Sequence, residues 1–178
     1  HRLAQPLENE CNPATGGLPP GENLISESSD DGHTWSLPKP LAHTRPEVLE
    51  VSGPAIQSRS GDLLALGYPM LPWDGKRPSG HVGVLLRSKD HGRTWDDRTL
   101  YFNHPKLSPL EARLCQMSDG RIVAIAWALD EASGKAANNH IVFSEDDGKT
   151  WSDPIDTGID AQASNLIPLG ENQLLSIH

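Results

Sequence analysis

The hydrophobic residues of this chain fall in short runs separated by turns, and none of the runs has a helical period. In the middle of the chain, apolar or alternating stretches occupy residues 54–59, 62–68, 81–87 and 98–102, with Gly, Pro, Asp or Ser around their ends. Runs of this length bounded by turn residues are typical of β-strands. The pattern therefore predicts an all-β chain, with four antiparallel strands in this unit.

An octapeptide with the pattern Ser-x-Asp-x-Gly-x-Thr-Trp occurs three times in the chain. The copies are residues 28–35, 88–95 and 144–151, so they start 60 and 56 residues apart. Each copy follows a short β-rich run, at residues 23–25, 82–86 and 140–143. Five fixed positions in three copies are too many for chance, and a repeat of this length indicates an architecture built from similar units.

A pattern typical of a β-hairpin also recurs in register with the octapeptide, at residues 60–66, 119–125 and 171–177. Gly61, Gly120 and Asn172 occupy the same place in it, and Gly and Asn tolerate the positive φ that tight turns require. Each repeat unit thus holds four strands. Four-stranded units repeated at this spacing are typical of β-propeller blades.

The repeat predicts a single partial β-propeller of about three blades. Residues 1–43 are expected to form the back half of one blade, 44–102 and 103–160 two whole blades, and 161–178 the front half of another. Because about four to eight blades are needed to close a ring, the chain is interpreted as about half of a ring. The alternative is that two chains pair to complete one. The unpaired strand edges of an isolated copy would favour self-association.

The octapeptide has a structural explanation that needs no ligand. Its Asp can accept hydrogen bonds from the backbone of its own turn, and its Trp can fold back and pack between strands. We therefore expect Trp35, Trp95 and Trp151 to be mostly buried in equivalent places. The three Asp residues lie one per blade, so they are not expected to converge on a metal ion or a substrate.

The octapeptide is the Asp-box, or BNR repeat, and through it the chain resembles the sialidase (neuraminidase) superfamily of six-bladed β-propellers. The resemblance covers nearly the whole chain. It implies a glycoside hydrolase that removes a terminal acidic sugar from a glycoconjugate or polysaccharide, without a cofactor. Xyloglucan-cleaving glycosidases, sortilin-type receptors and photosystem assembly factors also carry Asp-boxes, so the fold does not choose the activity. The alternatives are a non-catalytic propeller that binds glycans or proteins, and another glycosidase or a polysaccharide lyase on this fold.

Composition excludes some partners and leaves the cellular location open. The 178 residues carry a net charge of −9, which disfavours nucleic acid because phosphate backbones repel an acidic protein. The longest apolar run, residues 122–129, is too short to span a membrane. No signal peptide is visible, and secretion and the periplasm both stay open. Cys11 and Cys115 lie far apart in the sequence and no histidine pair has metal-ligand spacing, so no disulfide framework and no metal site are expected.

Glu111 and Arg113 are the first candidates for chemistry. They are predicted to open an innermost strand, on the face opposite the Asp-box turns, and residues two apart point the same way in an ideal strand. The resemblance implies that Glu111 matches the sialidase Glu that activates a Tyr nucleophile. It also implies that Arg113 matches one of three arginines that hold the substrate carboxylate. Of the two tyrosines, Tyr101 falls on an outer strand and Tyr68 is interpreted as packing. The residues alone equally allow an ion pair that lines a wet central channel.

Four more residues are candidates for substrate binding. Arg45 begins an Arg-Pro-Glu sequence that is superficially similar to the sialidase Arg-Ile-Pro motif. Trp73 and Asp74 lie in a long loop on the candidate face, where an aromatic ring beside charges suits a sugar; alternatively, Trp73 covers a blade edge. Asp130 is either a second carboxylate that works with Glu111 or a solvated loop charge.

Overall fold

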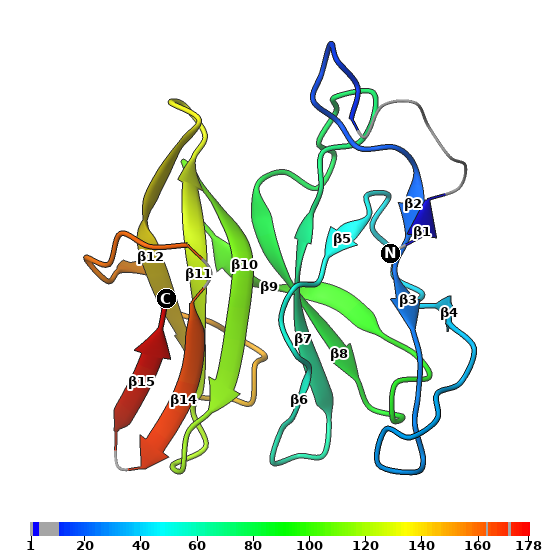
Figure 1. Ribbon diagram of the computed structural model, residues 1–178. Coiled ribbons are helices and arrows are strands. Elements are labelled where there is room, and N and C mark those ends of the chain that lie inside the picture. Colours follow the sequence, from blue (N-terminus) through cyan, green and yellow to red (C-terminus); the bar gives the residue numbers. More distant parts are fainter. Residues whose placement is uncertain (1, 4–10, 163, 171) are drawn as a thin grey trace.

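The protein is built from β-strands, without a helix in the part that the computed structural model describes, residues 2–3, 11–162, 164–170 and 172–178 (Figure 1). The paired strands are antiparallel. In chain order the strands of these residues are β1 (Arg2–Leu3), β2 (Gly21–Glu22), β3 (Leu24–Ile25), β4 (Lys39–Pro40), β5 (Leu49–Glu50), β6 (Ile56–Gln57), β7 (Leu63–Pro69), β8 (Val82–Ser88), β9 (Asp96–Asn103), β10 (Leu107–Gln116), β11 (Ile122–Asp130), β12 (Lys135–Ser144), β13 (Ile155–Asp156), β14 (Asn165–Gly170) and β15 (Gln173–Ile177).

Two sheets follow the chain strand by strand, as propeller blades do. The first has β5 and β6 on β7, followed by β8 and β9, and the second has the order β10-β11-β12-β13. The pairs β3–β4 and β14–β15 lie on either side of these two blades (Figure 1). The predicted all-β, propeller-type fold class is confirmed.

The innermost strand of the first blade differs from the one predicted at residues 54–59. It consists of two short pieces, β5 and β6, which pair with opposite ends of β7. The break between them contains Pro54, which has no amide hydrogen to donate to a ladder. Gly53 beside it packs so closely on β10 that a Cβ would lie 2.6 Å from the Ala112 carbonyl oxygen. The strand is therefore interrupted where it contacts the next blade.

The largest hydrophobic cluster lies between the two complete blades. Alternate residues of a strand share a face, and Leu64 and Leu66 of β7 meet Ile122 and Ala124 of β11 in this cluster. The opposite face of β11, with Val123 and Ile125, packs in a second cluster with Leu166 of β14. The second blade thus buries one face against each neighbour.

The three Asp-box turns have the same hydrogen bonds. In the second copy the Asp90 carboxylate accepts the Thr94 amide at 2.8 Å and the Thr94 hydroxyl at 2.6 Å, and the Ser88 hydroxyl donates to it at 2.8 Å. The first and third copies repeat this arrangement. The bonds from Thr94, the side chain foremost, lower the pKa of Asp90 to about 2. The oxygens of each of these carboxylates therefore accept hydrogen bonds from residues of the same turn.

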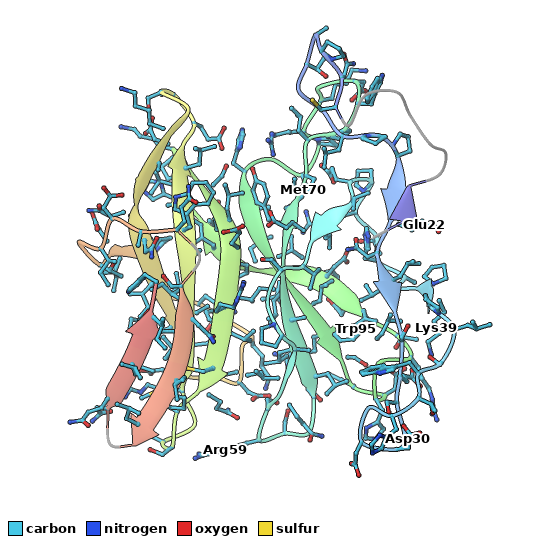
Figure 2. The ribbon with its side chains drawn as sticks, viewed as in Figure 1. Glu22, Asp30, Lys39, Arg59, Met70 and Trp95 are labelled. Atoms are coloured by element: carbon cyan, nitrogen blue, oxygen red, sulfur yellow. The ribbon has the colours of Figure 1, made fainter. Side chains whose placement is uncertain are left out.

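The prediction that all three Asp-box Trp side chains are mostly buried is wrong for Trp35, which is 65% exposed. Each indole nitrogen donates to the Gly carbonyl three residues earlier, so the three places are equivalent. Trp151, half-buried, packs edge-on against Tyr101 of the preceding blade. Trp95, also half-buried, lies beside the β3–β4 pair (Figure 2) and packs against a buried cluster to which Leu41 of the preceding repeat also adds. For Trp151 the preceding repeat therefore supplies cover, and the described residues contain no repeat before that of Trp35.

No helix in the described residues is long and apolar enough to cross a membrane.

Candidate functional site

The loops of the blades lie at two ends of the molecule. Figure 1 shows the hairpins β6–β7, β10–β11 and β14–β15 at one end, together with the Asp-box turn between β3 and β4. Residues 70–80 and the β11–β12 turn lie at the other end. Glu111 and Arg113 belong to β10, the first strand of its blade, which contacts β7 of the preceding blade and β14 of the following one.

The prediction that Glu111 opens its strand is wrong, because β10 already begins at Leu107. It lies instead in a β-bulge: the register shifts between Leu110 and Arg113, so Glu111 and Ala112 together oppose one residue of β11. Its φ is 46°, a left-handed conformation that costs a residue with a side chain about 1–2 kcal/mol. The ideal-strand argument for a shared direction does not apply across such a bulge, because a bulge re-aims a side chain.

A second carboxylate, Glu50 of β5, lies within electrostatic range of Glu111 and Arg113. Burial raises the pKa of Glu50, the negative charge of Glu111 raises it further, and the Arg113 guanidinium offsets part of the shift. Ser52, two residues after Glu50, lies 3.3 Å from Nη1 of Arg113, which donates to its hydroxyl. These contacts bring the β5 segment of one blade and the bulge of the next together at one inner surface.

The guanidinium of Arg113 is held over the bulge itself. Its Nη1 also donates to the carbonyl oxygens of Glu111, at 3.0 Å, and of Ala112, at 3.1 Å. The Arg113 guanidinium can bind an anionic group, because its fork of N–H donors matches a carboxylate. Glu50, whose pKa is raised, is suited to proton exchange with such a group.

A buried hydrogen-bond chain joins the two blades near the same end. Arg77 Nη1 donates to the Tyr68 hydroxyl at 2.7 Å, Tyr68 donates to the Ser108 hydroxyl at 3.0 Å, and Ser108 donates to the Glu131 carboxylate. His81 Nδ1 lies 2.8 Å from that carboxylate. Ser108 is fully buried. These hydrogen bonds therefore fix residues 68–81 of one blade to β10 and the β11–β12 turn of the next.

A family model described as the BNR repeat-like domain matches residues 22–169 of the chain. The chain belongs to this family. Its BNR repeats are the three Asp-box turns described above, and the predicted resemblance to the sialidase superfamily is confirmed by this match and by the relatives below.

Two curated relatives are named sialidase. The one from Paraclostridium sordellii is 25% identical over 117 residues, which cover 58% of this chain and 29% of that protein. The one from Bacteroides fragilis (strain YCH46) is 24% identical over 135 residues, which cover 73% of this chain and 22% of that protein. The BNR chain therefore spans less than a third of the length of these relatives.

Two solved structures have the same fold. A protein of unknown function from Dyadobacter fermentans DSM 18053 matches with a TM-score of 0.69 at 22% identity, over 86% of this chain and 43% of that one. The Hadza microbial sialidase Hz136 matches with a TM-score of 0.59 at 19% identity, over 82% of this chain and 33% of that one.

Arg45 and Asp130, two of the predicted substrate-binding residues of this BNR chain, have local partners. Arg45 donates to the carbonyl of Asp97 at 3.2 Å, and the Asp97 carboxylate accepts the Arg45 amide at 3.1 Å. Asp130 accepts the amide and hydroxyl of Ser133 in the β11–β12 turn, at 2.8 and 2.7 Å. These bonds, the Ser133 hydroxyl foremost, lower the pKa of Asp130. The carboxyl group whose pKa the charge of Glu111 raises is instead that of Glu50.

Trp73 and Asp74 lie in the 70–80 segment, at the end of the molecule opposite the Asp-box turns (Figure 1). Trp73 is half-buried and lines a pocket, whereas Asp74 is exposed and pairs with Lys76 at 3.3 Å. The sequence alone did not single out Glu50, His81 or Ser108. Glu50 was missed because the strand was expected to begin only at residue 54.

Within the described residues, no group of three or more His, Cys, Asp or Glu side chains is placed to hold a metal ion.

Proposed function

We propose that the whole protein is a glycoside hydrolase of the sialidase type, which removes a terminal acidic sugar, with Glu111 as a catalytic residue. Arg113 binds the carboxylate of that sugar. The observation that carries the proposal is the bulge of β10, where Glu111 holds a left-handed conformation beside Glu50 and Arg113. Non-glycine residues in such conformations cluster at active sites, where the surrounding structure holds them. Membership of the BNR family and the two relatives named sialidase support the same activity.

The test is a panel of fluorogenic glycosides, with acidic and neutral sugars, assayed on the whole protein and two variants. Glu111→Gln is nearly isosteric, so we expect it to fold and to turn over the acidic glycoside about 10²-fold more slowly or worse. Glu145→Gln is the matched control, because Glu145 is exposed in the third Asp-box turn, and we expect it to keep wild-type turnover. Full activity of Glu111→Gln would refute the catalytic role.

A non-catalytic glycan-binding propeller is the second candidate, and the two tyrosines favour it. A sialidase mechanism uses a Tyr nucleophile, but Tyr101 is 1% exposed and Tyr68 is 4% exposed. Burial raises the pKa of both hydroxyl groups. Binding of acidic oligosaccharides without turnover of any glycoside in the panel would support this candidate over the hydrolase.

A further inference from the structure

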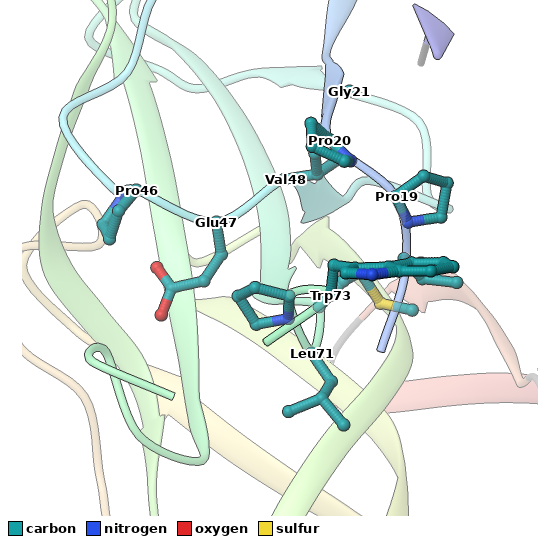
Figure 3. A pocket seen from close by; sticks show the side chains of 11 residues that line it. Pro19, Pro20, Gly21, Pro46, Glu47, Val48, Leu71 and Trp73 are labelled. Atoms are coloured by element: carbon teal, nitrogen blue, oxygen red, sulfur yellow. The ribbon is translucent and has the colours of Figure 1, made fainter. Parts of the chain in front are cut away.

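Glu50 is a titratable group of the candidate site to which the proposed function gives no role. It ends β5, and together with Ser52 it lines a hollow of about 200 Å³. The hollow adjoins the cavity of about 170 Å³ that Figure 3 shows, because Val48 and Met70 line both. Glu50, which is half-buried, therefore borders an open space rather than the packed interior of its blade.

The segment that follows Glu50 packs directly on the bulge of β10. The Ser52 hydroxyl accepts a hydrogen bond from Nη1 of Arg113 at 3.3 Å. Gly53 lies so close that a Cβ there would be 2.6 Å from the Ala112 carbonyl oxygen and 3.3 Å from Cδ of Arg113. Since Ser52 both lines the hollow and contacts Arg113, the hollow of Glu50 lies beside that guanidinium.

Arg113 is held through one of its terminal nitrogens. Its Nη1 donates to Ser52 and to the carbonyl oxygens of Glu111 and Ala112. In the part of the chain that the structure describes, these acceptors leave Nε and Nη2 for a ligand, and a guanidinium edge with two N–H donors matches the two oxygens of a carboxylate. An acidic sugar bound there has its glycosidic oxygen on the same ring as its carboxylate. A group that protonates this oxygen must therefore lie near Arg113, as Glu50 does.

The surroundings of Glu50 favour its protonated form. Burial raises the pKa of its carboxyl group, the negative charge of Glu111 raises it further, and Arg113 offsets only part of the shift. A carboxyl group of raised pKa keeps its proton closer to neutral pH, which is what a general acid requires. The pKa of Asp130 is lowered instead, so that residue is ionised at neutral pH and has no proton to donate.

We propose that Glu50 is the general acid of the hydrolase, and that its carboxyl group donates a proton to the glycosidic oxygen of the sugar whose carboxylate Arg113 binds. This inference rests on the proposed function and adds a catalytic residue to it. The general acid and the carboxylate-binding Arg113 then come from two different blades, which Ser52 and Gly53 bring into contact.

Water is the co-reactant of the step. The bond between the anomeric carbon and the glycosidic oxygen breaks, its electron pair moves to the oxygen, and the Glu50 proton joins that oxygen. The alcohol leaves as a neutral molecule, and Glu50 becomes a carboxylate. Water supplies the hydroxyl group of the released sugar, and its remaining proton restores the Glu50 carboxyl group.

The test measures kcat/KM of the whole protein on two glycosides of N-acetylneuraminic acid, the acidic sugar used as the probe. Sialyllactose has an alcohol leaving group that must be protonated, whereas the 4-nitrophenyl glycoside releases a phenolate that is stable without a proton. Glu50→Gln should lower kcat/KM for sialyllactose by about 10²-fold or more, and for the nitrophenyl glycoside by less than about tenfold. Glu22→Gln is the matched control, because Glu22 also ends a two-residue strand and is exposed, and it should change neither value.

The pH dependence of kcat/KM distinguishes a proton donor from a residue that only supports the structure. The wild-type value for sialyllactose should fall as the pH rises through the raised pKa of Glu50, because only the protonated carboxyl group donates. The residual activity of Glu50→Gln should lack this alkaline limb. Glu50→Asp, which keeps a carboxyl group on a side chain one methylene shorter, should retain the limb at a lower rate.

The outcomes separate the general acid from the proposed hydrolase. If the wild type hydrolyses both glycosides, the hydrolase stands, and equal losses on the two substrates in Glu50→Gln, or no loss on either, overturn Glu50 as its general acid. An alkaline limb that is absent from Glu50→Asp overturns it as well, whether or not Glu50→Gln folds. A wild type that hydrolyses neither glycoside overturns the role of Glu50 in releasing this sugar, and turnover of the other glycosides of the panel then decides the hydrolase separately.

Discussion

The left-handed conformation of Glu111 can be tested apart from its carboxylate by comparing two variants that both lack it. Glu111→Ala keeps a Cβ at a φ of 46°, at a cost of about 1–2 kcal/mol, whereas glycine adopts this conformation freely. Glycine also loses more conformational entropy on folding, which costs about 0.5–1 kcal/mol relative to alanine. The difference leaves Glu111→Gly more stable than Glu111→Ala by about 0.5–1 kcal/mol.

The assay is urea-induced unfolding of the whole protein, followed by circular dichroism. Ala136→Gly serves as the control, because Ala136 is an exposed residue of β12 without a positive φ, and there glycine should cost about 0.5–1 kcal/mol. The sign of the Ala-to-Gly difference should therefore reverse between the two positions. A Glu111→Gly protein that is less stable than Glu111→Ala, by as much as the control loses, would refute the strain at the bulge.

Two further predictions concern the surroundings of the bulge. The pKa of Glu50 is raised on folding by burial and then by Glu111, so its ionised form destabilises the folded state: wild-type stability falls as the pH rises from the unfolded value of 4.5 through the raised folded value. Glu50→Gln should accordingly be more stable than the wild type at neutral pH and lose that advantage below pH 4.5, the unfolded pKa. Urea midpoints of the two proteins that differ equally at every pH in this window would contradict the raised pKa of Glu50. Ser108→Ala should lower the free energy of unfolding by about 1–3 kcal/mol, because it leaves the buried Tyr68 hydroxyl without its acceptor. Ser133→Ala, in an exposed turn, should change it by no more than about 0.5 kcal/mol. Equal unfolding midpoints for the two variants would show that the hydrogen bonds of Ser108 add no stability.

The sequence predicts the parts of the fold whose interactions are local. The structure of an Asp-box turn can be predicted from sequence because the hydrogen-bond partners of Asp90, Ser88 and Thr94, lie within a few positions of it. The burial of the Asp-box Trp cannot be predicted from the turn alone, since Tyr101, which packs on Trp151, comes from the preceding blade. Trp35 has the same turn and is nevertheless exposed, because its local bonds determine its conformation and a neighbouring repeat determines its burial.

The candidate site is less readable than the fold because it depends on two irregularities. Glu and Ala give no sign of a bulge, so the sequence predicts Glu111 in a regular strand rather than at a positive φ. Pro54 signals a break in the strand, but it does not reveal that a further piece of the same strand, β5, pairs with β7 before the break. Glu50 ends β5 and Ser52 follows two residues later, the spacing of residues that share a strand face, and this spacing is the signal that could have found them.

The interface between the two blades determines how close Glu50 and Glu111 lie, because one carboxylate comes from each blade. The apolar cluster fills the middle of this interface. At the Asp-box end Arg87 donates to Asp62 of its own blade at 2.7 Å and to the backbone of Asp147 of the next. At the other end the chain from Tyr68 through Ser108 to Glu131 joins the same two blades. With polar contacts at both ends and packed side chains between them, the blades cannot rotate to separate the carboxylates without breaking these hydrogen bonds. A pair of acidic groups held together in this way is preorganised, and the proposed hydrolase requires such preorganisation to stabilise a charged transition state.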